Sequence, residues 1–65
     1  MKLIINGCEA QVSATRLDAL IRELDHQDQW VATAVNGTMV PRDRRDAHAL
    51  KEGDRVEILS PMQGG

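Results

Sequence analysis

Short apolar runs separated by Asn-Gly pairs set the pattern of the chain. The first run covers residues 2–5, is rich in β-branched side chains and ends at Asn6-Gly7. Asn-Gly favours a β-hairpin, because a type I′ turn requires positive φ at both central residues. Residues 9–12 are expected to form the returning strand. Cys8 lies between the turn pair and that strand, which leaves room for a loop longer than two residues.

A helical pattern follows, with apolar side chains three and four residues apart. They form one stripe of Leu17, Leu20, Ile21 and Leu24. Thr15 is the expected N-cap, with Asp18 as the acidic half of a capping box, and Ser13 is the alternative cap. Polar residues replace the stripe at 25–27, so the pattern predicts a helix of about three turns that ends there.

The second half of the chain returns to the strand pattern around another Asn-Gly pair. Residues 31–35 and 38–40 are expected to form the second hairpin. Residues 42–50 are polar and irregular, with room for a helical turn and with Leu50 as an apolar anchor. Residues 55–59 follow a Gly-Asp turn, alternate in polarity and are predicted to form the last strand.

The predicted order is two strands, one helix and three strands. A chain of 65 residues holds one small domain. One helix can cover one face of a mixed sheet, so we expect a two-layer α+β domain over residues 1–60, with about five strands. The last strand is expected to lie centrally, beside the first. Residues 61–65 lack a packing pattern and are expected to form a flexible tail.

Composition excludes several classes of function. A formal net charge of −2 argues against a general nucleic-acid binder. Trp30 is the sole aromatic side chain, which leaves little for base stacking. It is expected to pack between helix and sheet or to be exposed at a partner interface. No apolar run approaches the roughly 20 residues that span a bilayer, and no signal-peptide pattern is present, so we expect a cytoplasmic protein without membrane contact.

The reactive side chains form no evident catalytic or metal site. Cys8 is the single cysteine, and His26 and His48 are distant in sequence, so no metal is expected. Cys8 could relay a persulfide, but an incidental cysteine is the favoured interpretation. Both histidines are expected to be solvated. A basic cluster interrupted by acidic residues is interpreted as a solvated loop rather than a site for RNA or an acidic partner, and consists of Arg42, Arg44 and Arg45.

The final residues, 61–65, close with Gly64-Gly65. Residues without side chains form a narrow peptide that can enter a partner's site and present the carboxylate of Gly65. Fully extended, residues 60–65 reach at most roughly 20 Å. Two glycines alone also fit a frayed or truncated terminus, but the pattern of the folded body favours the functional interpretation.

Several short motifs along the chain carry a resemblance to a known family. They are the opening strand that ends at Asn6, Thr15 with Leu20 and Ile21, Ala34-Val35-Asn36-Gly37, Val40-Pro41-Arg42, Leu50 with Gly53-Asp54, and Gly64-Gly65. In this order and spacing the chain resembles the ubiquitin-like β-grasp proteins, and among them the ThiS family of thiamin-biosynthesis sulfur carriers. The resemblance covers essentially the whole chain and implies the β-grasp fold.

The resemblance also implies that the chain is a carrier and not an enzyme. In that family an E1-like, ThiF-like adenylyltransferase activates the terminal carboxylate with ATP, and a sulfur donor system converts it to a thiocarboxylate. A ThiG-like thiazole synthase then takes the sulfur. Carried over to this sequence, Gly65 is the modified residue and Gly64 gives clearance in a narrow tunnel. ATP and its metal are expected on the partner, and no cofactor on this chain.

A carrier body needs a surface on which the partner docks. The alternation of polarity places one set toward the helix, namely Leu3, Ile5, Val56 and Ile58. Ile4 and Leu59 then point away. The docking candidates are Ile4, Leu59, Met62 and Gln63, which include an apolar patch beside the tail if the first and last strands are neighbours. Scattered exposed apolar side chains, which are normal on protein surfaces, are the alternative.

Other functions fit the same pattern. A related carrier could serve molybdopterin synthesis or tRNA thiolation, and a ubiquitin-like modifier could use the same tail for conjugation to lysine. A non-covalent β-grasp binding module requires no terminal Gly-Gly. The acceptor is a property of the partner, so these alternatives stay open.

Overall fold

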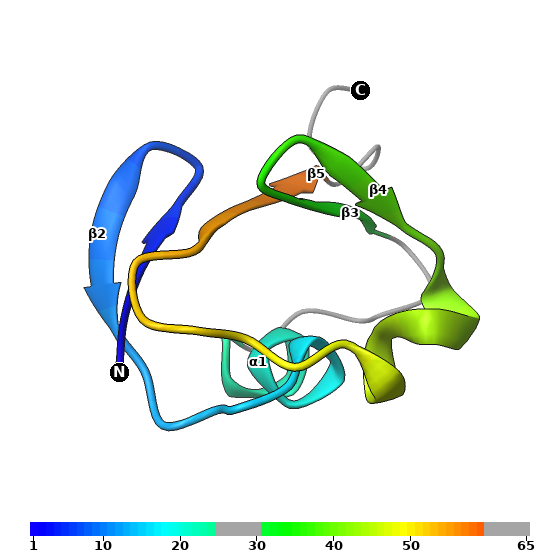
Figure 1. Cartoon of the computed structure of the whole chain (residues 1–65), viewed down its shortest axis with the longest axis horizontal. Helices are drawn as coiled ribbons and strands as arrows, with labels where there is room; N and C mark the ends of the chain where they lie inside the picture. The colour runs from blue at the N-terminus through cyan, green and yellow to red at the C-terminus, as the bar shows by residue number, and fades with distance from the viewer. Residues whose placement is uncertain (25–30, 60–65) are drawn as a thin grey trace.

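The computed structural model describes residues 1–24 and 31–59, which form a mixed sheet covered on one face by an α-helix (Figure 1). The strands are β1 (Lys2–Ile5), β2 (Cys8–Gln11), β3 (Ala32–Val35), β4 (Thr38–Val40) and β5 (Arg55–Leu59). Their order is β2-β1-β5-β3-β4, with β5 parallel to β1 and antiparallel to β3. The central last strand and the covering helix confirm the predicted two-layer α+β fold of the ubiquitin-like β-grasp type.

Both Asn-Gly pairs form the predicted hairpin turns. Asn6 and Gly7 have φ values of 51° and 83°, and Asn36 and Gly37 have values of 52° and 84°, as the type I′ turn requires. Ile5 pairs directly with Cys8, so the first turn holds two residues. The two-residue turn is therefore formed rather than the longer alternative, and β2 begins at Cys8, one residue earlier than predicted.

The helix α1 (Leu17–Glu23) is shorter than predicted and begins differently. It has 7 residues, or about two turns, and ends before residues 25–27. Arg16 holds the N-cap position in an extended conformation, and no side chain caps the helix, so the predicted caps were wrong. The Thr15 carbonyl accepts the Leu50 N–H, and Arg16 forms a β-bridge with Ala49. This extended pairing replaces a side-chain cap in directing the chain into α1.

The carboxylate of Glu23 binds the loop between β2 and α1. Its Oε1 accepts the N–H of Ala14 at 2.8 Å, and its two oxygens accept the N–H of Ser13 at 3.1 and 3.0 Å. A residue near the end of the helix therefore satisfies backbone donors in the segment that precedes the helix. The predicted cap Ser13 is thus a donor to Glu23 rather than a helix cap.

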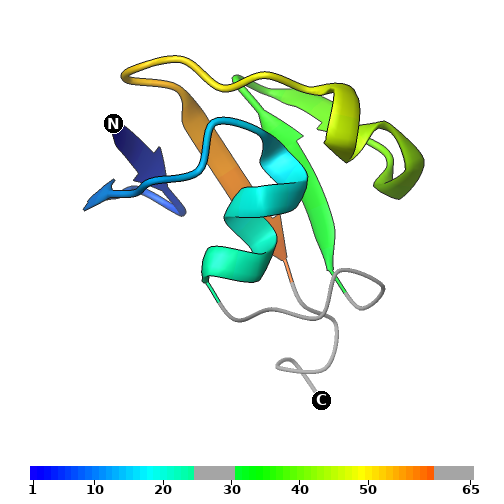
Figure 2. The same cartoon turned by 90° about the horizontal axis from the view of Figure 1, so that it is seen from below.

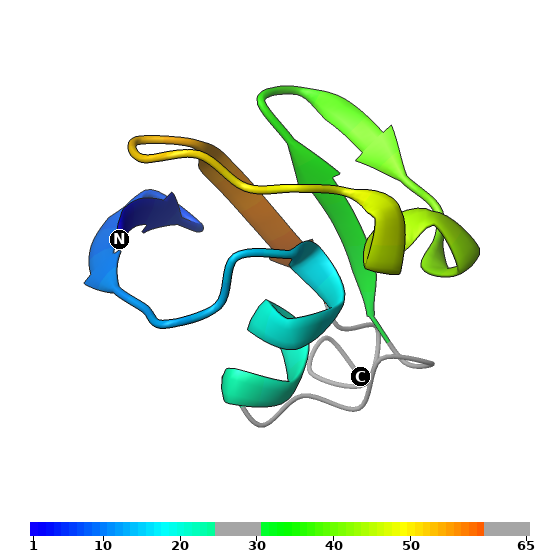
Figure 3. The ribbon, with the colours of Figure 1, turned by 60° about the horizontal axis from the view of Figure 1, so that its bottom comes forward.

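The core lies between α1 and the inner face of the sheet, which the helix crosses in Figures 2 and 3. Its most deeply buried apolar side chains are Leu3, Leu17, Leu20, Ile21 and Val56. Ile58 is buried with them, and Ile5 and Leu24 are half-buried against the core. These positions confirm the helical stripe and the strand alternation. The predicted packing of Trp30 lies outside the described residues.

Arg45 contradicts the expectation of a solvated basic loop. The segment forms a 3₁₀ helix, η2 (Arg42–Ala47), in which Arg42 and Arg44 are exposed but Arg45 is only 2% exposed. The Arg45 Nε donates to Thr33 Oγ1 at 3.1 Å, and its Nη2 donates to the carbonyl of Val31 at 2.6 Å. The guanidinium therefore fastens η2 to the beginning of β3, because a buried charge requires partners of this kind.

Replacing Arg45 by Met is expected to lower the free energy of unfolding by about 2 kcal/mol. Met fills part of the same volume but removes the donors to the buried Thr33 hydroxyl and the partly buried Val31 carbonyl, and a buried acceptor that loses its partner costs roughly 1–3 kcal/mol. Urea denaturation monitored by circular dichroism measures the change. The matched control is Arg44→Met at an exposed position of η2, where we expect a change within about 0.5 kcal/mol. Equal effects of the two substitutions would contradict the role of Arg45.

Candidate functional site

The end of β5 is the described segment closest in sequence to the expected reacting group. Leu59 is the last residue of β5. The predicted tail, its carboxyl residue Gly65, its neighbour Gly64 and the docking candidates Met62 and Gln63 lie outside the described residues. Their roles stay predictions, and the described part of the site is the strand that leads to them.

The outer face of the sheet carries an apolar area next to this strand end. Val56 and Ile58 point into the core, so Leu59 faces away from α1 and is 67% exposed. Sheet register places Leu59 beside Ala32 on β3, and Ala34 beside Met39 on β4. Met39 is also 67% exposed. We name the surface formed by Ala32, Ala34, Met39 and Leu59 the outer patch. Glu57, which lies opposite Ala34 on the same face, borders it.

Leu59 is the one member of the outer patch that was predicted from the sequence. The other members could have been found from β3, where Thr33 and Val35 are buried and the residues alternating with them, Ala32 and Ala34, face outward. Met39 follows from its pairing opposite Ala34 across the second turn. The sequence does not show which face of this hairpin covers the core. Alanine is small and only weakly apolar, so the alternation of polarity along β3 is weak.

Ile4 faces outward as predicted but does not adjoin Leu59. It lies opposite Arg55 at the beginning of β5, whereas Leu59 is four residues further along, or about 13 Å at 3.3 Å per residue. Arg55 and Glu57 separate the two on the outer face. The expected single patch of Ile4 with Leu59 is therefore interrupted by charged side chains, and the docking role of each stays a prediction.

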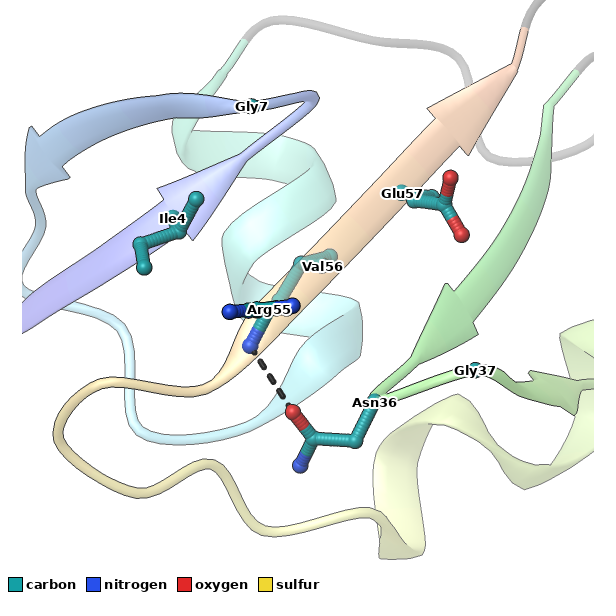
Figure 4. A pocket seen from close by; sticks show the side chains of 7 residues that line it. All are labelled: Ile4, Gly7, Asn36, Gly37, Arg55, Val56 and Glu57. Atoms are coloured by element: carbon teal, nitrogen blue, oxygen red, sulfur yellow. Dashed lines mark hydrogen bonds between the residues drawn. The ribbon is translucent and has the colours of Figure 1, made fainter.

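Ile4 instead borders a depression between the two Asn-Gly turns (Figure 4). In that view Ile4 lies on one side, the second turn on the other, and Arg55 between them. The depression has a volume of about 790 Å³. The lining residues are Ile4, Gly7, Asn36, Gly37, Arg55, Val56 and Glu57. Arg55 and Glu57 bring opposite charges to this region of the outer face.

Other candidate groups are dispersed. Cys8 is exposed beside the first turn, and His48 is half-buried after η2 rather than solvated as predicted. His26 lies outside the described residues. Among residues 1–24 and 31–59, no cluster of three or more metal-binding side chains occurs. Within the same residues, no helix has the length and apolar character needed to cross a bilayer.

Comparison with known proteins gives consistent matches over the whole chain. The model of the ThiS family matches residues 4–65. The chain is 27% identical to the sulfur carrier protein ThiS of Escherichia coli K12, with full coverage of both chains. It is 38% identical to a segment of a thiazole synthase from Paramagnetospirillum magneticum, of which it spans only 20%.

Solved structures give the same result in three dimensions. The crystal structure of the thiamine biosynthesis protein ThiS from Geobacter metallireducens superposes with a TM-score of 0.84 at 33% identity, and each chain is covered completely. The solution structure of a thiamine biosynthesis protein from the same organism gives a TM-score of 0.81 and is covered to 88%. The ThiS crystal structure is 33% identical to this chain over the full length of both. The similarity therefore includes the amino-acid sequence as well as the fold.

Proposed function

This chain belongs to the ThiS family, and from that membership we propose that it is a sulfur carrier of thiamin biosynthesis with the Gly65 carboxylate as its reacting group. The observation that carries the proposal is the family match over residues 4–65, which includes Gly64-Gly65. The chain acts in this proposal as a co-substrate and binds no cofactor of its own. We place it in the cytosol, where ATP and thiols are available.

The proposed chemistry converts a poor electrophile into a reactive one. A carboxylate oxygen of Gly65 attacks the α-phosphorus of ATP on an E1-like adenylyltransferase, and pyrophosphate leaves. A persulfide from the sulfur donor system then attacks the acyl carbon and displaces AMP. A thiol then attacks the donor's sulfur in the resulting S–S bond, forms a disulfide with the donor and releases the thiocarboxylate. The nucleotide and its metal belong to the adenylyltransferase, so the carrier supplies the carboxylate and its placement.

Thiazole synthase is the proposed acceptor of the sulfur. Support comes from the Paramagnetospirillum magneticum thiazole synthase, a segment of which is similar to this whole chain. A carrier-like segment within a synthase is consistent with transfer between the two. We therefore propose a separate thiazole synthase as the partner that receives sulfur from Gly65.

The outer patch is the proposed docking surface for the adenylyltransferase. Its member Leu59 lies two residues before the tail, so a partner bound there is within reach of residues 60–65, which extend at most roughly 20 Å. Ordering the tail costs about 1–2 kcal/mol of backbone entropy for each residue fixed. Burial of Leu59 and Met39, both largely exposed in the free chain, offsets some of that cost.

The proposal is tested by offering the thiocarboxylated chain to competing acceptors. We expect thiazole synthase, supplied with its other substrates, to consume the thiocarboxylate, as measured by mass spectrometry of the carrier. The large subunit of molybdopterin synthase, offered the same carrier, is the control and is expected to leave it intact. Consumption by the control acceptor alone would assign the chain to the molybdopterin pathway instead.

A further inference from the structure

The end of β5 has a backbone neighbour on only one side. On the β3 side, pairing continues to the last residue, where Ala32 lies opposite Leu59. On the β1 side, strand pairing stops at Ile5 opposite Val56, because β1 turns away at Asn6-Gly7. The backbone groups of Ile58 that face β1 therefore lie beyond the end of that strand.

The side chain of Asn6 takes the place of the missing strand. The Asn6 Nδ2 donates to the Ile58 carbonyl at 3.1 Å, and the Ile58 N–H donates to Asn6 Oδ1 at 2.8 Å. One step earlier, the backbone N–H of Asn6 donates to the Val56 carbonyl at 2.9 Å. The amide thus extends the β1–β5 ladder by one step, since it presents a donor and an acceptor as a peptide group does.

The second turn provides an internal comparison. Asn36 has nearly the same φ as Asn6, 52° against 51°, and its amide also reaches β5. Its Oδ1 accepts the Arg55 N–H at 3.0 Å, and its Nδ2 donates to Asp54 Oδ1 at 3.1 Å; Figure 4 shows the first of these bonds. The two asparagines therefore hold opposite ends of β5, and only Asn6 holds the end from which the tail departs.

We propose that Asn6 is a positioning residue for the reacting tail, because it fixes the last residues of β5 and so the point at which the chain leaves the sheet toward Gly65. This inference rests on the proposed function. Without the amide, the backbone of Ile58 and Leu59 has hydrogen-bonding neighbours on the β3 side alone, although the Ile58 side chain stays in the core. The segment that must be ordered in the partner's site then becomes longer, and each further residue adds to the entropy that binding must overcome. Loss of the Asn6 amide therefore affects the placement of the Gly65 carboxylate more than the docking of the folded domain on the partner.

The test compares Asn6→Gly with Asn36→Gly. Glycine adopts positive φ readily, so both variants keep their turns, and each loses two side-chain hydrogen bonds to the β5 region. With the cognate adenylyltransferase and the carrier as varied substrate, we expect Asn6→Gly to lower kcat for pyrophosphate release about fivefold, with KM within about twofold. Asn36→Gly is expected to leave both constants within about twofold of the original chain.

A second readout does not depend on any partner. Amide hydrogen exchange is expected to accelerate at Ile58 and Leu59 in Asn6→Gly, and at Arg55 in Asn36→Gly. Asn6→Asp, which keeps the acceptor and loses the donor, is expected to show the same changes to a smaller degree and serves if the glycine variant does not fold. Equal kcat for the two glycine variants, or unchanged exchange at Ile58 in Asn6→Gly, would overturn the inference. An original chain that no adenylyltransferase accepts would instead refute the proposed function, and the exchange data would still decide whether Asn6 holds the end of β5.

Discussion

Deleting Gly65 is expected to abolish thiocarboxylate formation, with a fall in kcat/KM of about a thousandfold or more. The shortened chain still ends in a glycine carboxylate, but that carboxylate lies one residue, or about 3.3–3.6 Å, short of the reacting position. A displacement of about 1 Å can already cost a hundredfold in rate when reacting groups must be aligned. Single-turnover assays with the adenylyltransferase and its sulfur donor measure the loss.

Two variants distinguish the effect of the length of the tail from the effect of side-chain bulk within it. Gly64→Ala keeps the length of the chain but adds a Cβ, so we expect a smaller loss of about tenfold, caused by crowding in the partner's tunnel. A chain extended by one glycine overshoots the site and is expected to be as inactive as the deletion. Full activity of the shortened or the extended chain would show that the position of the carboxylate does not control the reaction.

Replacing Leu59 by Asp is expected to lower kcat/KM for adenylation about a hundredfold, mainly through KM. Leu59 is 67% exposed and lies in the outer patch, where a partner would bury it. A carboxylate buried against apolar side chains of a partner costs roughly 2–3 kcal/mol of binding free energy, which corresponds to this factor. The free energy of unfolding is expected to change by about 0.5 kcal/mol or less, because the side chain is exposed in the free chain.

Thr15→Asp is the matched control for this surface. Thr15 is exposed on the segment that leads into α1, away from the outer patch, and receives the same added charge. We expect KM to stay within about twofold of the original value. A similar rise in KM for both substitutions would indicate a general effect of charge, and an unchanged KM for Leu59→Asp would remove the outer patch from the docking surface.

Much of the fold was predictable because its signals are local. Each Asn-Gly pair specifies a two-residue turn through positive φ, and that turn sets the register of its hairpin. The stripe of α1 and the alternation of β5 then identify the face that each element buries. These patterns need no knowledge of distant segments of the chain.

The missed features depend on contacts between distant segments. The start of α1 is determined by the pairing of Arg16 with Ala49, which no pattern near the helix reveals. Burial of Arg45 depends on its bonds to Val31 and Thr33, so its charged neighbours in sequence were misleading. The candidate site could not be predicted fully for the same reason. The separation of Ile4 from Leu59 follows from the parallel register of β1 with β5, which pairs segments distant in sequence.

Intact-mass spectrometry decides whether Gly65 carries the sulfur. After incubation with ATP, magnesium, the cognate adenylyltransferase and the sulfur donor, we expect the 7.2 kDa chain to gain about 16 Da, the difference between sulfur and oxygen. Fragmentation should place the gain on Gly65. An unchanged mass with an enzyme that is active on its own carrier, or a gain of about 32 Da on Cys8 as a persulfide, would contradict the account.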